Sequence, residues 1–301
     1  MLEIRNDNRM NAPASLVTQP VELLRDDQEA EVLDFLAANP SLSFVMTGWI
    51  KDNGLVNKLN RGSFYATRNG LGHIDGVALI GHVTCFDTNS DAACAAFADL
   101  ARNNSETFLL LGEEQRLSRF MSFYAPDSTR SHSTSRQLLF EQRSRVNCES
   151  TVPDLRRATL EELDLIVPVH AQMAFEQSGV NPLDVDAAGF RDRCARRIQQ
   201  GRIWVCVENG QLVFKADVVI DVPDVNYLEG VYLRPESRGR GLASACVRQL
   251  TNVLLAHTKS VCLLTEENES AAQACYLRAG FKLREYYQTV FLQQETSESD
   301  N

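Results

Sequence analysis

Residues 238–244, "RGRGLAS", combine residue types and spacing that could do chemistry. Gly239 and Gly241 alternate with two arginines, directly before an apolar segment with helical spacing. A helix N-terminus presents unpaired backbone N–H groups and the positive end of the helix dipole, and glycine lets the backbone approach a bulky anion. The loop is therefore predicted to bind a phosphate group. A glycine-rich turn with solvated arginines is the competing interpretation.

The two usual nucleotide signatures do not fit this loop. The chain contains no GxxxxGK[ST] sequence, and the GxGxxG pattern fits only as far as Gly241, because Ser244 stands where the third glycine would fall. The eight cysteines include no CxxC pair and the five histidines are scattered. The cysteines are interpreted as small buried hydrophobic residues in a reducing compartment, and no metal site is predicted.

The composition is that of a globular protein. Hydrophobic residues make up 44% of the 301 residues and charged residues 23%, a length that suits two domains. The formal charge of −10 argues against nucleic acid as a partner. No apolar run approaches the roughly 20 residues that span a bilayer, and the N-terminus has no signal-peptide core, so a cytoplasmic protein is expected.

The elements that position the loop follow from periodicity and turn signals in the second half. Asn209-Gly210 between two apolar runs predicts a β-hairpin, because both turn residues need positive φ. A capping box at Thr159 opens a helix that Pro168 is expected to kink or divide. The remaining predictions are helices at 184–200, from 242 and at 270–279, strands at 226–233, 261–265 and 281–292, and a disordered tail from about residue 294.

The first half repeats this order of elements. Helices are predicted at 26–38, near 52–60, at 91–102 and at 113–124, with a hairpin around Asn69-Gly70 and strands at 107–111 and 136–140. Two copies of one α/β (α+β) fold are expected, each a mixed, mostly antiparallel sheet flanked by helices. The predicted domains are 1–150 and 151–301. The first copy reads "HVTCFDTNSDAAC" where the second has its Gly/Arg loop.

Two motifs together resemble the GCN5-related N-acetyltransferase (GNAT) family. The pattern R/Q-x-x-G-x-G/A of the family's pyrophosphate loop falls on Arg238, Gly241 and Ala243. Residues 265–281, "TEENESAAQACYLRAGF", resemble its second motif, a strand, an Asn and a helix that bears Tyr and ends in Gly-Phe. The resemblance covers roughly 155–293. It implies two tandem acyl-CoA N-acyltransferase domains, of which the first is degenerate, as in a two-domain bacterial subgroup.

The resemblance implies that the chain transfers an acetyl group from acetyl-CoA to an amine, without a metal. The backbone of Val231 would hold the acetyl carbonyl, Leu233 and Asn268 would contact the pantetheine arm, and residues 238–244 would hold the pyrophosphate. The implied cofactor-binding residues are Val231, Tyr232, Leu233, Arg238, Gly239, Arg240, Gly241, Leu242, Ala243, Ser244 and Asn268.

Two residues are implied to be catalytic. A protonated amine must lose a proton before it attacks the thioester, and Glu229 is the candidate base. Tyr276 matches the family's general acid, which protonates the departing thiolate. A strand-surface carboxylate and a core tyrosine are the alternatives. Phe175, Glu176 and the "SGVNP" loop are candidates for acceptor contact, whereas His170 is interpreted as structural.

Two other functions stay open at this level. One is a non-catalytic acyl-CoA-binding regulatory module. The other is a first domain that binds the acceptor, a partner protein or the second subunit of a homodimer. The acceptor could be an amino acid, a polyamine, an antibiotic, a peptide N-terminus or a lysine, and a longer acyl donor stays open as well.

Overall fold

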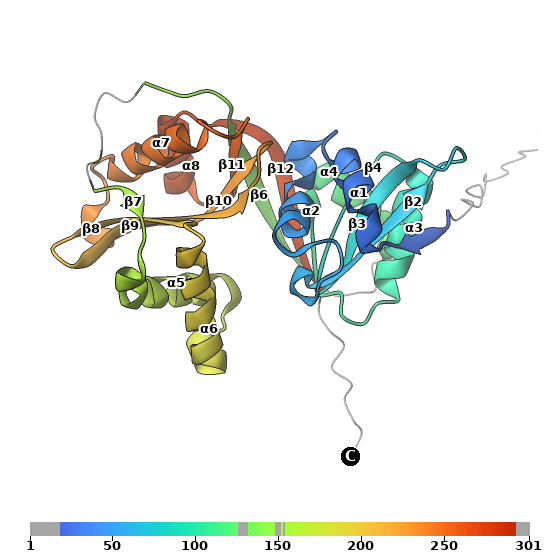
Figure 1. Ribbon diagram of the computed structural model, residues 1–301, viewed down its shortest axis with the longest axis horizontal. Helices are drawn as coiled ribbons and strands as arrows, with labels where there is room; N and C mark the ends of the chain where they lie inside the picture. Colours follow the sequence, from blue (N-terminus) through green and yellow to red (C-terminus); the bar gives the residue numbers. More distant parts are fainter. Residues whose placement is uncertain (1–18, 126–131, 148–151, 153, 293–301) are drawn as a thin grey trace, which may run out of the picture.

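The computed structural model describes residues 19–125, 132–147, 152 and 154–292. The predicted tail from about 294 and Cys148 lie outside these ranges; the seven cysteines inside them are free and buried. The fold is mixed α/β, with one continuous 12-stranded, mostly antiparallel sheet flanked by helices (Figure 1). The strands are hydrogen-bonded in the order β1-β2-β3-β4-β5-β12-β6-β11-β10-β9-β8-β7.

The first half follows the predicted order, but one predicted helix is wrong and two strands, at Val21–Leu23 and Val83–Thr88, were not predicted. The helix expected near 52–60 is wrong: the chain is helical earlier, from Pro40 at the first position of α2 to Asn53, and only a 3-10 turn follows at Lys58–Asn60. The elements are β1 (Val21–Leu23), α1 (Glu29–Leu36), α2 (Pro40–Asn53), β2 (Gly62–Arg68), β3 (Ile74–Gly81), β4 (Val83–Thr88), α3 (Asp91–Arg102), β5 (Leu109–Glu113), α4 (Glu114–Tyr124) and β6 (His132–Gln142).

The second half also matches its prediction closely. The hairpin at Asn209-Gly210 has positive φ at both residues, 51° and 73°. Pro168 does not divide its helix, because the residues on either side of it pack into one apolar cluster with the neighbouring helix. The elements are β7 (Arg156–Arg157), α5 (Leu163–Ser178), α6 (Pro182–Gln199), β8 (Ile203–Glu208), β9 (Gln211–Asp221), β10 (Asn226–Leu233), α7 (Leu242–Leu254), β11 (Val261–Glu266), α8 (Ser270–Ala279) and β12 (Lys282–Leu292).

The two halves exchange their last strands. The strand β6 of the first half pairs with β11 of the second, and β12 of the second half pairs with β5 of the first. The two exchanged strands also pair with each other, from His132↔Leu292 to Glu141↔Lys282, and run side by side between the halves in Figure 1. Each half is therefore completed by a strand that the other half supplies.

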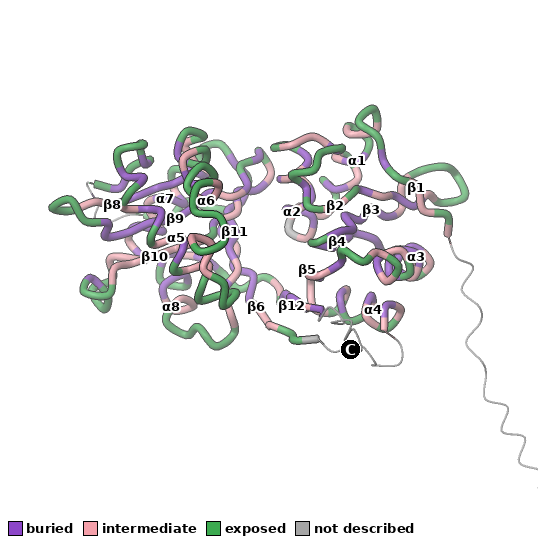
Figure 2. The backbone as a smooth tube through the Cα atoms, turned by 90° about the horizontal axis from the view of Figure 1, so that it is seen from below, coloured by how far each residue is buried: buried purple, intermediate pink, exposed green. Residues whose placement is uncertain are grey.

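Both faces of the second half's sheet are covered. The helices α7 and α8 pack on one face over a core that includes Phe214, Leu228 and Leu263, and α5 and α6 pack on the other over Ile203 and Val205. Buried strands run between more exposed helices in both halves (Figure 2). The side chains of β9 therefore alternate between two different helical layers.

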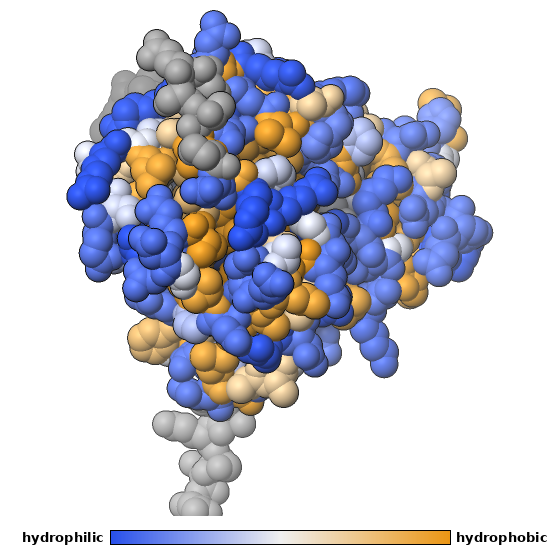
Figure 3. Space-filling view, turned by 60° about the vertical axis from the view of Figure 1, so that its left-hand side comes forward, coloured by the Kyte–Doolittle hydropathy of each residue, from blue (hydrophilic) through white to orange (hydrophobic). Residues whose placement is uncertain are grey.

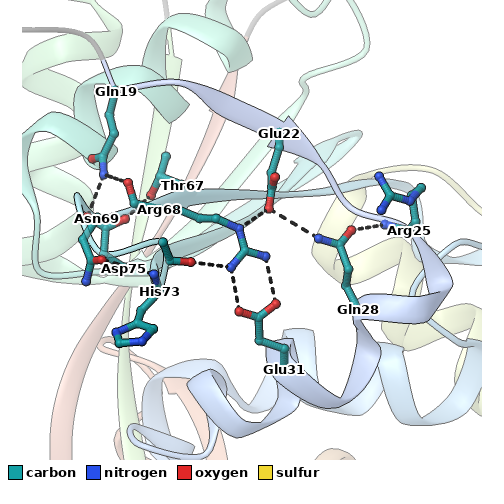
Figure 4. Close-up of polar contacts among 11 residues, drawn as sticks. Gln19, Glu22, Arg25, Gln28, Glu31, Thr67, Arg68, Asn69, His73 and Asp75 are labelled. Carbon is teal, nitrogen blue, oxygen red and sulfur yellow. Dashed lines mark hydrogen bonds and ion pairs between the residues drawn. The ribbon is translucent and has the colours of Figure 1, made fainter.

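Ion pairs stabilise the outer edge of the first half. The Arg68 guanidinium of β2 binds Glu22 of β1 at 2.7 Å and Glu31 of α1 at 2.6 Å (Figure 4). The hydrogen bond from Arg68 lowers the pKa of Glu31. Beside them, Gln28 accepts a hydrogen bond from the backbone N–H of Arg25 at 2.9 Å, which caps the turn before α1. One arginine thus joins two strands and a helix.

Candidate functional site

The candidate site lies where two parallel strands of the second half separate. The strands β10 and β11 pair from Asn226↔Val261 to Leu228↔Leu263, and β10 continues unpaired with β11 to Leu233. A bulge between Glu229 and Tyr232 shifts the register of β10 against β9, with φ of +59° at Gly230. We call this opening between β10 and β11 the second fork, because it lies in the second half. The predicted residues Val231, Tyr232 and Leu233 lie half-buried along it.

The Gly/Arg loop follows directly and leaves the N-terminus of α7 without a side-chain cap. Gly239 and Gly241 have φ of +78° and +76°, a conformation that glycine adopts without strain. Ala245 is the first residue whose N–H bonds back, to the Gly241 carbonyl at 3.1 Å, whereas those of residues 239–244 have no acceptor among the described residues. Six free donors at a helix N-terminus are an arrangement that can bind an anion, and we call them the cradle.

The side chains around this cradle leave it accessible. Arg238 turns back, and its Nε donates to the Leu233 carbonyl at 3.2 Å, while Arg240 is exposed. The hydroxyl of Ser244 donates to the Gly241 carbonyl at 2.8 Å, and Leu242 and Ala243 pack on the core beneath. The predicted loop residues are thus brought together, with backbone groups rather than arginine side chains at the helix end.

Tyr276 is a residue of α8 that is buried in the core, and a strand of the first half helps to bury it. Its ring centroid is 6.1 Å from that of Phe140 on β6 and 6.2 Å from that of Phe281. Only 7% of the residue is exposed, and burial raises its pKa well above the usual range. A phenol in this environment keeps its proton at neutral pH, as a general acid must.

Asn268 is exposed in the turn between β11 and α8. The two residues before it are held by β6 of the first half: Gln137 donates to Glu266 at 2.8 Å, and Arg136 forms an ion pair with Glu267. The exchanged strand therefore supports this turn as well as Tyr276.

Glu229 lies on the face of the sheet covered by α5 and α6, whereas Tyr276 lies on the face covered by α7 and α8. Glu229 is exposed and stands directly opposite Asp217 of β9. Tyr227, two residues earlier on the same face, stacks on Phe44 of α2 with ring centroids 4.9 Å apart. The first half therefore borders this side of the site too.

A buried charged cluster beside Glu229 was not singled out from the sequence. Lys215 is 0% exposed, and its Nζ donates to Asp217 Oδ2 at 2.8 Å; His170 Nε2 contacts the same oxygen at 2.9 Å. Burial alone would raise the pKa of Asp217, but the two partners outweigh it and bring the pKa to about 2. Burial lowers the pKa of Lys215. The sequence signal that could have revealed this cluster is a pair of charges, two residues apart, in the otherwise apolar strand "LVFKADVVI".

The described residues offer neither a metal site nor a membrane-spanning helix. In the part of the chain that the structure describes, no three or more His, Cys, Asp or Glu side chains are grouped so as to hold a metal ion. None of the helices in the described ranges is both long enough and apolar enough to cross a membrane.

Comparison with known proteins finds a family similarity within the second half. Residues 170–281 match the family model of the acetyltransferase (GNAT) family. No curated protein matches the chain. The fold also matches several solved structures over nearly their full length. A GCN5-related N-acetyltransferase from Sphaerobacter thermophilus has 11% identity and a TM-score of 0.60, covering 91% of this chain and 95% of its own.

Two further structures show the same architecture. A GNAT-family acetyltransferase from Colwellia psychrerythraea has 12% identity and a TM-score of 0.56, covering 91% of this chain and 99% of its own. A tandem GNAT protein from the clavulanic acid biosynthesis pathway has 13% identity and a TM-score of 0.56, covering 91% of this chain and 98% of its own. Residues 170–281 thus match the GNAT acetyltransferase family model, and the chain that contains them has the fold of a tandem GNAT protein.

Proposed function

We propose that the second half is an acetyl-CoA-dependent N-acetyltransferase that acts on a primary amine. The observation that carries this proposal is the uncapped N-terminus of α7, whose free N–H groups lie directly after the strand that opens the second fork. The N–H groups of residues 239–244 would hold the pyrophosphate. Val231 and Leu233 on β10, and Asn268 beyond β11, would hold the acetyl carbonyl and the pantetheine arm.

The chemistry that we propose is a direct transfer in a ternary complex. The amine nitrogen attacks the thioester carbon while the backbone N–H of Val231 donates to the developing oxyanion. Glu229 takes a proton from the amine, the C–N bond forms and the C–S bond breaks. Tyr276 donates its hydroxyl proton to the departing sulfur and is reprotonated from solvent. Because Glu229 and Tyr276 lie on opposite faces of the sheet, the fork is where they would act on one substrate.

The acceptor would enter from the face covered by α5 and α6. The helix ends there carry exposed apolar side chains, with Phe175 52% and Val180 55% exposed. Figure 3 shows apolar residues in separate patches among hydrophilic ones rather than in one continuous surface. With Phe44 of the first half packed beside Tyr227, we propose that the first half forms one wall of the acceptor site. We place the enzyme in the cytoplasm.

The test is the release of free CoA thiol from acetyl-CoA with a panel of amines: amino acids, polyamines, lysine-containing peptides and peptide N-termini. The wild-type protein is expected to release thiol with at least one class, and Glu229→Gln is expected to be at least about 100-fold slower at neutral pH. Calorimetric titration with CoA is the parallel measurement. Binding of CoA without turnover of any amine would favour a non-catalytic acyl-CoA-binding module, and failure to bind CoA would overturn both functions.

A further inference from the structure

A cavity in the first half takes no part in the proposed function. Its volume is about 770 Å³, within the range of roughly 300–1,000 Å³ that small-molecule sites occupy. It lies between the end of β1, the loop before β2 and the residues that precede β4 and β5. At its rim, Leu23 and Val56 are 59% and 60% exposed. Its floor consists of buried apolar side chains, those of Leu24, Leu55, Phe64 and Ile80.

The wall that carries Val56 is held in place by the protein's own hydrogen bonds. Asn60 is 0% exposed; its Nδ2 donates to the Gly54 carbonyl at 2.9 Å, and its Oδ1 accepts from Asn53 at 2.9 Å. The backbone N–H of Val56 donates to Asp26 Oδ1 at 3.0 Å. A preformed wall needs little ordering when a ligand binds, so more of the contact free energy is available as affinity.

Two cations on this wall have no acidic partner. Lys58 and Arg61 line the cavity and are exposed, and neither forms an ion pair or a side-chain hydrogen bond with a described residue. By contrast, each of the other arginines in residues 19–125 forms an ion pair with a carboxylate. The wall therefore offers two free cations beside an apolar floor, in a chain whose formal charge is −10.

The charges around the cavity indicate the head group of its ligand. Lys58 and Arg61 outnumber the one carboxylate among the lining residues, that of Glu106, which leaves an excess of one positive charge with His82 counted as neutral. This excess complements a monoanion, and a guanidinium presents paired donors that match the two oxygens of a carboxylate. A dianion would instead leave uncompensated negative charge near Glu106, and an amine would face two like charges.

We propose that this cavity is a second ligand site, which binds a carboxylate with a long apolar body, of which a fatty acid is the simplest. The apolar body lies on the buried floor, and the carboxylate accepts hydrogen bonds from Lys58 and Arg61. None of the residues that line the cavity belongs to the second fork or to the cradle. The inference is therefore independent of the proposed function.

The test is calorimetric titration with decanoate, below the concentration at which it forms micelles, and with decanol, which has the same chain length and no charge. Decanoate is expected to bind at one site per chain. Decanol is expected to bind at least about tenfold more weakly, because it makes no charge-assisted hydrogen bond. No binding of decanoate, or equal binding of the two probes, would overturn the inference.

Substitutions at exposed positions locate the site. Arg61 has φ of +56°, so Arg61→Asn removes the guanidinium with a residue that tolerates this conformation, and Lys58→Met removes the other cation. Each is expected to weaken decanoate binding by about tenfold and to leave decanol binding unchanged. Val56→Asp adds a carboxylate at the rim and is expected to weaken decanoate binding by about 100-fold. Leu71→Asp, 83% exposed and outside the cavity, is the matched control and should bind decanoate normally.

A last titration separates this cavity from the proposed CoA site. Decanoate is expected to bind with the same affinity when CoA is present in saturating amount. Displacement of decanoate by CoA, or unchanged decanoate affinity in Arg61→Asn, Lys58→Met and Val56→Asp alike, would overturn the inference. If the protein does not bind CoA, the proposed function fails, while the variants still decide whether this cavity holds the carboxylate.

Discussion

The first half contains its own version of the fork, and it is closed. The strands β4 and β5 pair in parallel at Val83↔Leu109 and Thr84↔Leu110 and then separate, as β10 and β11 do. In this first fork, Asp87 is 1% exposed and accepts hydrogen bonds from Arg116 at 2.5 Å and Ser43 at 2.7 Å. The cavity that remains beside them is about 10 Å³, which is room for about one water molecule.

The helices that follow the two forks also differ, because only the one in the first half has a side-chain cap at its N-terminus. Ser90 caps α3 of the first half by accepting a hydrogen bond from the Ala93 N–H at 3.2 Å, whereas Gly241 leaves α7 without a side-chain cap. A cap satisfies donors that a phosphate would otherwise use. The two halves thus differ in how many N–H groups are left free at the helix end that follows the fork.

The largest effect is expected when the N-terminus of α7 is blocked. Gly241→Glu places a carboxylate at the cradle and forces a side chain into φ of +76°, so CoA affinity should fall by about 1000-fold or more. Calorimetric titration with CoA measures the loss. Gly210→Glu, at φ of +73° in a hairpin turn, is the matched control and should bind CoA normally. Unchanged affinity in Gly241→Glu would mean that α7 does not hold the pyrophosphate.

A change in the first fork should affect stability and not CoA binding. Arg116→Met leaves the buried Asp87 carboxylate without its cation, which should cost about 3 kcal/mol of unfolding free energy in urea titration. Arg119→Met, on the same helix but in a more exposed pair with Asp91, should cost less than about 1 kcal/mol. A loss of CoA affinity in Arg116→Met at temperatures where it stays folded would show that the first fork also takes part in binding.

Tyr276 is the seventh residue of α8, and the seventh residue of the corresponding helix α4 is Phe120. The substitution Tyr276→Phe therefore gives the second half the residue type that the first half has at this position. We expect kcat to fall about 100-fold with unchanged CoA affinity, because only the proton donor is removed. Tyr286→Phe on β12 should keep full activity. A kcat within twofold of wild type in Tyr276→Phe would rule out its role as the acid.

The smallest effect concerns the caps of the first helix in each half. Glu162 forms the capping box before α5, and the hydrogen bond from Arg156 lowers its pKa from 4.5 to about 2; Gln28 is the uncharged counterpart before α1. Because Glu162 titrates lower in the folded chain than in the unfolded one, its contribution to stability is present above about pH 4.5 and is lost as the pH falls toward 2.

Glu162→Gln should therefore show a smaller loss of stability between pH 5 and pH 3 than the wild type, measured as urea midpoints. The exposed neighbour Glu161→Gln is the control and should keep the wild-type pH dependence. Equal slopes in all three proteins would show that this cap contributes no pH-dependent stability.

Local signals predicted much of the fold. The helix 91–102 matches α3 and the helix 270–279 matches α8 residue for residue, and Gly280 ends α8 at φ of +108° as its position suggests. The strand exchange was not predictable, because hydrophobic periodicity states which residues form a strand and not which strand it joins. The strand β4 was not predictable either, because its sequence "VTCFDT" contains polar residues. The structure buries these polar side chains through tertiary hydrogen bonds rather than through apolar packing.

For the candidate site, the loop motif predicted the glycine-rich turn before α7, and the second motif predicted the helix that carries Tyr276 and the turn that carries Asn268, because both depend on local sequence. The cluster around Lys215 depends on three separate elements and on the bulge at Gly230. The sequence shows only that two charges interrupt an apolar strand, so their partner His170 could be recognised only once α5 was packed on β9.

The exchange of β6 and β12 also sets when this protein can fold during its synthesis. The strand that completes the first half's sheet, Lys282–Leu292, follows every other described element of both halves and so leaves the ribosome after them. Until then β5 presents an open edge, and unpaired edges are sites of aggregation. Neither half can be finished before β12 has been synthesised, so a truncation within β12 should disable both halves, including the remote first one.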